Sequence, residues 1–284
     1  MFFQALYEGI INGAILAMIA MGIALVWGVM NILSFSQGEF MMIAMFVTYY
    51  LNVGLGLDPL ISLPVTMIFM GAFGLLVYKT IIAKALKGPI LSQRLVTFAL
   101  SMLFINIALM LFSGQYKTIS HLMISGNIDL EFVVIAKAKL VPFVIAIVIT
   151  GLLFFFMNKT RVGKSIRATA MDKRAAEFVG INSERTFALS YALSAAIAGA
   201  AGCGLSYYYY CYPQVGTNFQ LFGFIAVVMG GLGNIQGAFI GGLIMGIADS
   251  FTGLYLNTAF KYVGIIVIFL VILQFKPKGL FGGK

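Results

Sequence analysis

Long apolar runs dominate this sequence and decide what it can fold into. Nine of them follow one another, and most approach the roughly 20 residues that one membrane-spanning helix needs. They cover residues 9–30, 39–55, 60–82, 95–113, 140–158, 187–210, 219–231, 235–256 and 262–275. The chain is 61% hydrophobic and 10% charged, whereas a soluble domain is typically about 45–50% apolar and about 25% charged. We therefore predict an all-α, polytopic membrane bundle of about 8–10 transmembrane helices.

Two of these runs leave the number of crossings open. Residues 39–55 and 219–231 are short and contain glycine, so each can either span the membrane or enter and leave it on one side. We expect residues 1–284 to form a single transmembrane domain that contains broken or re-entrant segments.

The basic residues predict the orientation of the chain. Of the 18 Lys and Arg residues, 14 fall in residues 79–94, 159–185 and 276–284. The positive-inside rule places all three segments in the cytoplasm. Even numbers of apolar runs separate these segments, and three runs precede the first. We therefore predict an external N-terminus, a cytoplasmic C-terminus, an external loop at 114–139 and a cytoplasmic loop at 159–186.

Composition argues against several other classes of protein. In a membrane protein the net charge of +9 reflects topology, so we expect no nucleic-acid partner. Cys203 and Cys211 would lie about 12 Å apart on one helix, which is too far for a disulfide. No Cys or His spacing suggests a metal, and we expect no cofactor. Tyr207–Tyr210, followed by Tyr212, form either an interfacial aromatic belt or a cluster that faces a substrate.

Two interruptions between apolar runs are rich in glycine and amide side chains. They lie at residues 31–39 and 230–237. Lipid cannot satisfy the backbone of a broken helix, so such breaks line cavities or pack on protein, and one in each half points to a transport pathway. Ordinary tight turns are the alternative. The candidate pathway residues are Asn31, Gln37, Gly38, Glu39, Gly231, Gly233, Asn234 and Gln236.

Two acids lie in or near apolar runs, and several glycines recur at helical spacing. Glu39 and Asp249 could each be a pathway residue or a hydrogen-bond partner between helices. Glu39 could also lie at the N-terminus of a helix at the membrane interface, where the helix dipole stabilises an acid. Small residues four apart predict close helix packing. The pairs are Gly9 with Gly13, Gly237 with Gly241, and Gly242 with Gly246.

The basic segment at 160–182 carries a second signal. Its apolar residues follow helical spacing, so we expect a short amphipathic helix, with Gly180 as its stop and Asn182 or Ser183 capping the next helix. Such a helix either lies on anionic lipid or docks into a partner's groove. Gly163-Lys164-Ser165 is not part of a P-loop, because the first glycine of that motif is replaced by Asn158. We expect no enzymatic activity, and any ATP-driven role needs separate ATPase subunits.

Four segments in register resemble the branched-chain amino acid ABC transporter permeases. They are Gly163–Asn182, Asn31–Glu39, Gly230–Gly242 and the closing Lys276–Gly282. The resemblance spans nearly the whole chain. This chain departs from the family at two positions. It has Gln37 where the family often has His, and Asp249 where the family often has Glu.

The resemblance implies a membrane subunit of an importer in the bacterial plasma (inner) membrane. It implies a second related permease, two cytosolic ABC ATPases and an extracytoplasmic substrate-binding protein as partners, with branched-chain amino acids as substrates. Residues 164–181 would be the coupling helix that the ATPases move. The coupling residues would be Arg167, Asp172, Arg174, Glu177 and Gly180.

Other substrates and another class of transporter stay open. Urea and short-chain amides are the alternative substrates, since related permeases carry them. An ion-coupled secondary transporter or a channel is the rival class, but such proteins normally carry intramembrane charges suited to a relay, and this sequence has few.

Overall fold

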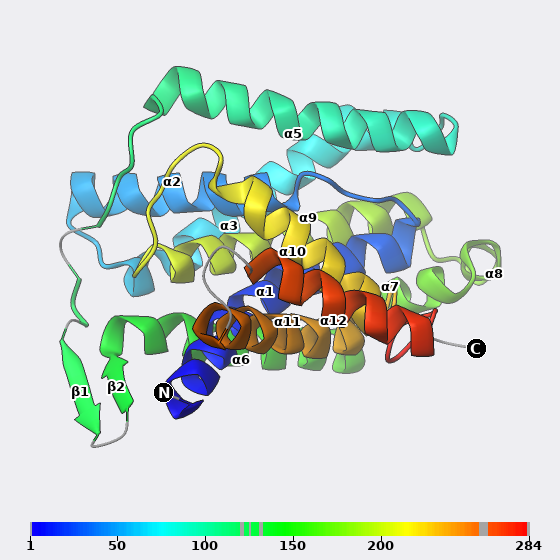
Figure 1. Ribbon diagram of the computed structural model, residues 1–284. Helices are drawn as coiled ribbons and strands as arrows, with labels where there is room; N and C mark the ends of the chain where they lie inside the picture. The colour runs from blue at the N-terminus through cyan, green and yellow to red at the C-terminus, as the bar shows by residue number, and fades with distance from the viewer. Residues whose placement is uncertain (1, 120–121, 125, 131–132, 256–260, 283–284) are drawn as a thin grey trace.

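The protein is a bundle of long helices, described here from a computed structural model of residues 2–119, 122–124, 126–130, 133–255 and 261–282 (Figure 1). The helices are α1 (Phe2–Met30), α2 (Gln37–Leu55), α3 (Pro59–Val77), α4 (Ala83–Ala85), α5 (Ile90–Phe112), α6 (Lys137–Lys159), α7 (Arg161–Met171), α8 (Lys173–Phe178), α9 (Ser183–Leu205), α10 (Val215–Gly230), α11 (Ile235–Tyr255) and α12 (Lys261–Phe275). A π-helical turn at Tyr78–Ile82 joins α3 to α4 without a break. The only strands in the described residues, β1 (Asn127–Leu130) and β2 (Val133–Ala136), form an antiparallel hairpin.

The all-helical membrane bundle predicted from the sequence is confirmed. Seven of the described helical stretches are long and apolar enough to cross a membrane, and two shorter apolar helices, at Val215–Gly230 and Tyr262–Phe275, accompany them. The run at 39–55 belongs to α2, a continuous helix of 19 residues that meets the length of a span. The run at 219–231 lies in α10, which at 16 residues is shorter than a span.

The two ends of the bundle differ in chemistry. We call the end that carries α4, α7, α8 and the C-terminal tail the basic end, and the opposite end, where β1 and β2 lie, the hairpin end (Figure 1). All three lysine- and arginine-rich segments therefore share one end, and the N-terminal residues of α1 lie towards the other. This arrangement agrees with the parity of crossings that the sequence predicts.

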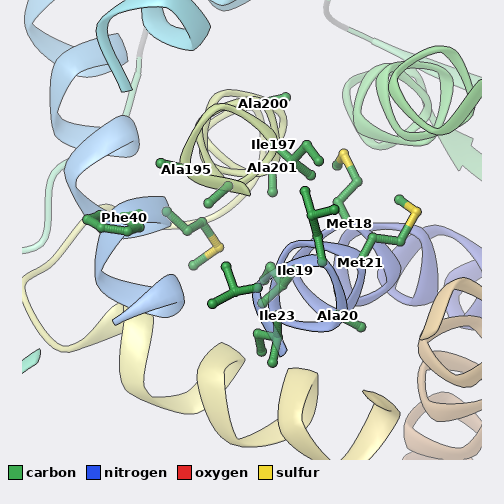
Figure 2. Close-up of a cluster of buried hydrophobic side chains, with 14 of the residues drawn as sticks. Met18, Ile19, Ala20, Met21, Ile23, Phe40, Ala195, Ile197, Ala200 and Ala201 are labelled. Carbon is green, nitrogen blue, oxygen red and sulfur yellow. The ribbon is translucent and has the colours of Figure 1, made fainter. Parts of the chain in front are cut away.

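The core is built around α1, whose residues from Ile11 to Val26 are almost all buried. Met18, Ile19 and Ile23 of α1 belong to a dense cluster of methionine, isoleucine and alanine side chains (Figure 2), and Ile19 and Ile23 lie against Gly223 of α10. Phe40 of α2 and Ala195 of α9 complete it. The small residues of α9 let this helix approach α1 closely, which is how helices pack where there is no water to expel.

The glycine pairs of α11 face two different helices. A Cβ on Gly246 would overlap the backbone of Gly13 in α1, and one on Gly242 would overlap Ala17. On the neighbouring face, a Cβ on Gly241 would overlap Ala226 of α10. The small-residue pairs predicted from the sequence thus hold α11 against both α1 and α10.

Two helices begin inside the bundle. After α1 ends, residues 31–36 run back along it, and α2 starts within the bundle (Figure 1). There the backbone of Gly38 meets that of Gly216 in the first turn of α10 so closely that neither position has room for a Cβ. The N-terminal turns of α2 and α10 therefore abut, and the two helices run from this point towards opposite ends.

The sixth apolar run, residues 187–210, is not one continuous helix as the sequence suggested. Helix α9 ends at Leu205, and Cys211 instead pairs in an isolated bridge with Lys117. The helical spacing assumed for the two cysteines is therefore wrong, although both are free and buried. Tyr207 is buried against Asp58, so the tyrosine run is not a uniform aromatic belt.

Candidate translocation and coupling sites

A cavity of about 620 Å³ opens at the basic end between α1, α6, α7 and the link from α10 to α11. It brings together four of the predicted pathway residues, Asn31, Gly233, Asn234 and Gln236, with Arg167 of the predicted coupling set. Trp27, Met157, Ile166, Met171 and Phe281 supply much of its apolar lining. Two separate sequence predictions thus meet in one cavity, because α7 folds back under the end of α1.

The second glycine-rich interruption is a tight turn, the alternative that the sequence left open. Gly231 and Gly233 have positive φ angles of 109° and 82°, which L side chains rarely adopt. The Asn234 Oδ1 atom accepts the amide of Gly237 at 3.1 Å and so caps the start of α11. The turn lies at the basic end, because Gly233 touches Gly28 near the end of α1.

The C-terminal tail closes over this turn. The amides of Leu280 and Phe281 donate to the carbonyls of Met229 and Gly230 at 2.7 and 3.0 Å. Asn234 Nδ2 donates in turn to the carbonyl of Phe281 at 3.1 Å. The tail thereby satisfies carbonyls at the end of α10 and places Phe281 in the cavity wall.

The first interruption is buried. Its predicted pathway residues Gln37, Gly38 and Glu39 do not line the 620 Å³ cavity but lie deeper, at the start of α2. Gln220 of α10 bridges the segment: its Oε1 accepts the amide of Gly38 at 2.6 Å, and its Nε2 donates to the carbonyl of Ser34 at 3.0 Å. These bonds supply partners for backbone that lipid could not satisfy.

Unsatisfied polar atoms remain in this buried segment. Both polar atoms of the Gln37 side chain and Oε2 of Glu39 have no hydrogen-bond partner. Glu39 lies in the first turn of α2, where the helix dipole favours an acid, but it is 1% exposed and so is not the interfacial residue that one interpretation expected. Buried groups left without partners are costly, so this segment is a place where a second conformation can gain hydrogen bonds.

The coupling segment is two helices, and the prediction of one amphipathic helix is wrong. Asp172 has extended backbone (φ −154°, ψ 111°), ends α7 and caps α8, with Oδ1 accepting the amides of Arg174 and Ala175 at 2.8 and 3.1 Å. Gly180, with a φ of 86°, ends the segment as predicted, and Asn182 caps α9 by accepting the amide of Arg185 at 2.9 Å.

The segment has one buried and one exposed side. Ile166 packs into the bundle, and Arg167 Nη1 donates to Asn158 Oδ1 of α6 at 3.0 Å. Met171, Phe178 and Val179 are 88%, 91% and 77% exposed. Of the predicted coupling residues, Arg167 therefore lies at the cavity, while Asp172, Arg174, Glu177 and Gly180 lie outside it.

A polar pocket at the hairpin end was missed by sequence reasoning. It has a volume of about 270 Å³ and contains Asn12, Asn218 and Asp249. The sequence offers Asp249 as a pathway residue or a hydrogen-bond partner between helices, but it does not group Asp249 with Asn12 and Asn218. A signal was present in Asn12, a polar residue near the start of the most apolar part of the chain, but nothing local connects it with α10 or α11.

A bundle of membrane-length helices whose polar residues line cavities towards both ends defines a multi-pass membrane transport protein. The family model described as "Branched-chain amino acid transport system / permease component" matches residues 5–273. The chain therefore belongs to the branched-chain amino acid transport permease family. It is a permease component of an ABC transporter, a non-catalytic transport subunit.

Two curated permease proteins match along almost the whole chain, and a third matches part of it. The high-affinity branched-chain amino acid transport system permease protein BraD of Pseudomonas aeruginosa is 28% identical, with 99% of this chain and 96% of the relative covered. LivH of Escherichia coli K12, a permease protein of the same kind of system, is 30% identical with the same coverage. The ribose import permease protein RbsC of Escherichia coli K12 is 32% identical over 44% of this chain and 42% of its own length.

Proposed function

We propose that this chain carries leucine, isoleucine and valine across a bacterial plasma membrane, driven by two separate cytosolic ATPase subunits. The observation that carries the proposal is the α7–α8 segment, which combines an exposed apolar and basic surface with a direct contact to the cavity at the basic end. The relatives that match along the full length are permeases of branched-chain amino acid systems, and this supports the substrate class.

The proposed orientation follows from charge. With the basic end in the cytoplasm, α7 and α8 face the ATPases, and the hairpin end faces an extracytoplasmic binding protein. A second permease, related or identical, completes the membrane part. The exposed Met171, Phe178 and Val179 would be covered by an ATPase, since side chains of this kind are seldom left in water beside so many charges.

Coupling would work through α7. Ile166 and Arg167 lie in the cavity wall, whereas Asp172 fixes the angle between α7 and α8. A displacement of α8 by ATPase closure would therefore pull on α7 and change the cavity that Asn31 and Asn234 line. Transport would alternate between states open to either side, with the unsatisfied Gln37 and Glu39 region as the part that rearranges.

The first experiment is a gentle-detergent purification of the tagged chain from its native membrane, with partners identified by mass spectrometry. We expect an ABC ATPase and a second permease to copurify. Uptake of labelled leucine and of urea is then measured in proteoliposomes that hold the purified complex, ATP inside and the binding protein outside. Leucine uptake is expected; uptake of urea instead would contradict the substrate assignment. Recovery of the chain alone, with gradient-driven uptake, would contradict the ATP-driven class.

The Asp172→Lys variant tests coupling in the same assay. It removes the cap of α8 and reverses a charge, so we expect uptake and transport-linked ATP hydrolysis to fall to background while the chain still reaches the membrane. Lys84→Glu, a charge reversal at the same end but outside α7 and α8, is the matched control and should transport normally. Wild-type uptake by Asp172→Lys would show that this segment does not couple.

A further inference from the structure

A second cavity lies in the half of the bundle nearer the hairpin end, with no lining residue in common with the cavity at the basic end. It measures about 270 Å³, slightly below the range of about 300–1,000 Å³ in which drug-sized ligands bind. Helices α1, α10, α11 and α12 and the turn after α9 enclose it. It is lined by Asn12, Leu16, Tyr208, Tyr209, Asn218, Phe219, Phe222, Asp249, Tyr262 and Ile265.

One side of this cavity is polar. Asp249 of α11 brings a carboxylate, and Asn12 of α1 and Asn218 of α10 bring amides. Tyr208 Oη donates to Asn12 Oδ1 at 3.0 Å, which fixes the orientation of that amide. Asn218 lies in the first turn of α10, where the helix dipole is positive. The site thus combines a carboxyl group, which accepts hydrogen bonds, with amide donors that suit an anion.

The other side is aromatic and aliphatic. The rings of Phe222 and Tyr262 stack with centroids 5.5 Å apart and planes 19° apart. Tyr209 and Phe219 meet edge to face at 5.6 Å. Leu16 and Ile265 complete this wall. Such a surface favours an apolar group, and aromatic faces beside a carboxylate favour an organic ammonium ion over a hydrated inorganic cation.

We propose that this cavity binds a small zwitterion with an apolar side chain, its ammonium group on Asp249 and its carboxylate on the amides of Asn12 and Asn218. The class of ligand is a free aliphatic amino acid, and the site is a stop on the path from the hairpin end to the basic end. This inference rests on the proposed function. An ionised carboxylate has about four lone-pair sites, so Asp249 can accept from a ligand in addition to protein donors. Asp249 is partly buried in a helix long enough to span the membrane, and acids in such helices face cavities and mark substrate pathways.

The test uses the purified complete complex in detergent without its binding protein. Binding is measured by scintillation proximity with labelled leucine, and leucine amide, which lacks the carboxylate, and 4-methylpentanoate, which lacks the ammonium group, serve as competitors. We expect Asp249→Asn to weaken leucine binding by about tenfold or more while leaving competition by 4-methylpentanoate unchanged. Asn218→Ala should weaken 4-methylpentanoate and spare leucine amide. A change in shape alone would affect all three ligands together.

Glu8→Gln is the matched control, because Glu8 is a carboxylate at the same end that pairs with Lys139 outside the cavity. It should bind leucine as the wild type does. If Asp249→Asn fails to assemble, the exposed Asn218 carries the test alone.

The outcomes separate the two proposals. Leucine uptake by the wild-type complex together with unchanged leucine binding by Asp249→Asn would overturn the site and leave the proposed function standing. Absence of leucine uptake by the wild-type complex would overturn the proposed function. If Asp249→Asn altered only a dependence of uptake on Na⁺, the cavity would hold an inorganic cation and the inference would be wrong.

Discussion

Glycine is required at single positions where two helix backbones touch. Gly246 of α11 packs on Gly13 of α1, and a Cβ there would overlap main-chain atoms that cannot rotate away. Because the contact lies between the central helix and a neighbour, α1 and α11 would have to separate along their length. Such overpacking typically costs about 1–3 kcal/mol and can cost more against backbone.

We therefore expect Gly246→Ala to lower the melting temperature of the purified protein and to reduce uptake. Gly151→Ala is the matched control, because the space beside Gly151 of α6 is open. It should be neutral or slightly stabilising, since alanine is the better helix former. Thermal unfolding in one detergent, followed by loss of monodisperse protein, measures both. Equal melting temperatures for the two variants would show that the α1–α11 contact is not as close as described.

Cys211 gives a prediction that depends on pH. Its backbone pairs with Lys117, with N···O distances of 2.8 and 3.0 Å, and burial raises the pKa of its thiol to about 12, an effect that the charge of Lys117 only partly opposes. The thiol therefore stays protonated at pH 8.5, where a free cysteine is about half thiolate.

In a Cys203→Ser background, we expect maleimide to modify folded Cys211 about 100-fold or more slowly than unfolded Cys211 at pH 8.5. The rate should keep rising with pH beyond the range in which a free thiol levels off. Mass spectrometry before and after addition of SDS measures the modified fraction. Rapid modification of the folded protein would mean that the bridge between Lys117 and Cys211 is open.

The C-terminal tail is hydrogen-bonded to the end of α10 and to the turn between α10 and α11. The Leu280 amide donates to the carbonyl of Met229 at 2.7 Å. We expect Leu280→Pro, which removes that donor, to lower the melting temperature and to impair uptake through the cavity that Phe281 lines. Leu280→Ala keeps the amide and is the control for loss of the side chain. If both variants behave alike, side-chain packing and not the hydrogen bond holds the tail.

The same elements show how far the sequence predicts this fold. Hydropathy places the helices, and the signals at Gly180 and Asn182 correctly mark the end of α8 and the start of α9. The sequence did not predict the break at Asp172 between α7 and α8. Aspartate caps helices but also occurs within them, so its presence alone does not indicate a helix end. Nor did the sequence show that α2 begins inside the bundle. That position depends on the contact of Gly38 with Gly216, which lie far apart in the chain.

Some residues of the candidate sites could be predicted from the sequence, whereas others could not. The glycine- and amide-rich breaks singled out Asn31 and Asn234, the family resemblance singled out Arg167, and the fold brings all three into one cavity. The second break is a tight turn at Gly231 and Gly233, an alternative that the sequence left open because a tight turn uses the same residues as a broken helix, and its pathway role stays a prediction. The pocket around Asp249 could not be predicted, because it forms only when four helices and the turn after α9 come together.

For the whole molecule, surface chemistry separates the ends from the sides. Large apolar side chains on α3, α5 and α6 are exposed along the sides, as shown by Ile68, Met110 and Phe155 at 74%, 87% and 64%. A water-soluble protein would not retain such a surface, so lipid or another membrane subunit covers it. The ends instead carry the charges, with most of the Lys and Arg residues at one of them.

The sidedness of the membrane decides which partner meets which end, and two exposed residues can measure it. Met123 lies after α5 in the predicted external loop, and Lys164 lies on α7 at the basic end. In a background with Cys203→Ser and Cys211→Ser, a membrane-impermeant maleimide should label Met123→Cys in intact cells, whereas Lys164→Cys should be labelled only after permeabilisation. The reverse pattern would put α7 and α8 outside, where no cytosolic ATPase could reach them, and the coupling proposal would fall with the orientation. Labelling of both in intact cells would place Met123 and Lys164 on the same side of the membrane, which contradicts a single crossing by α6 between them.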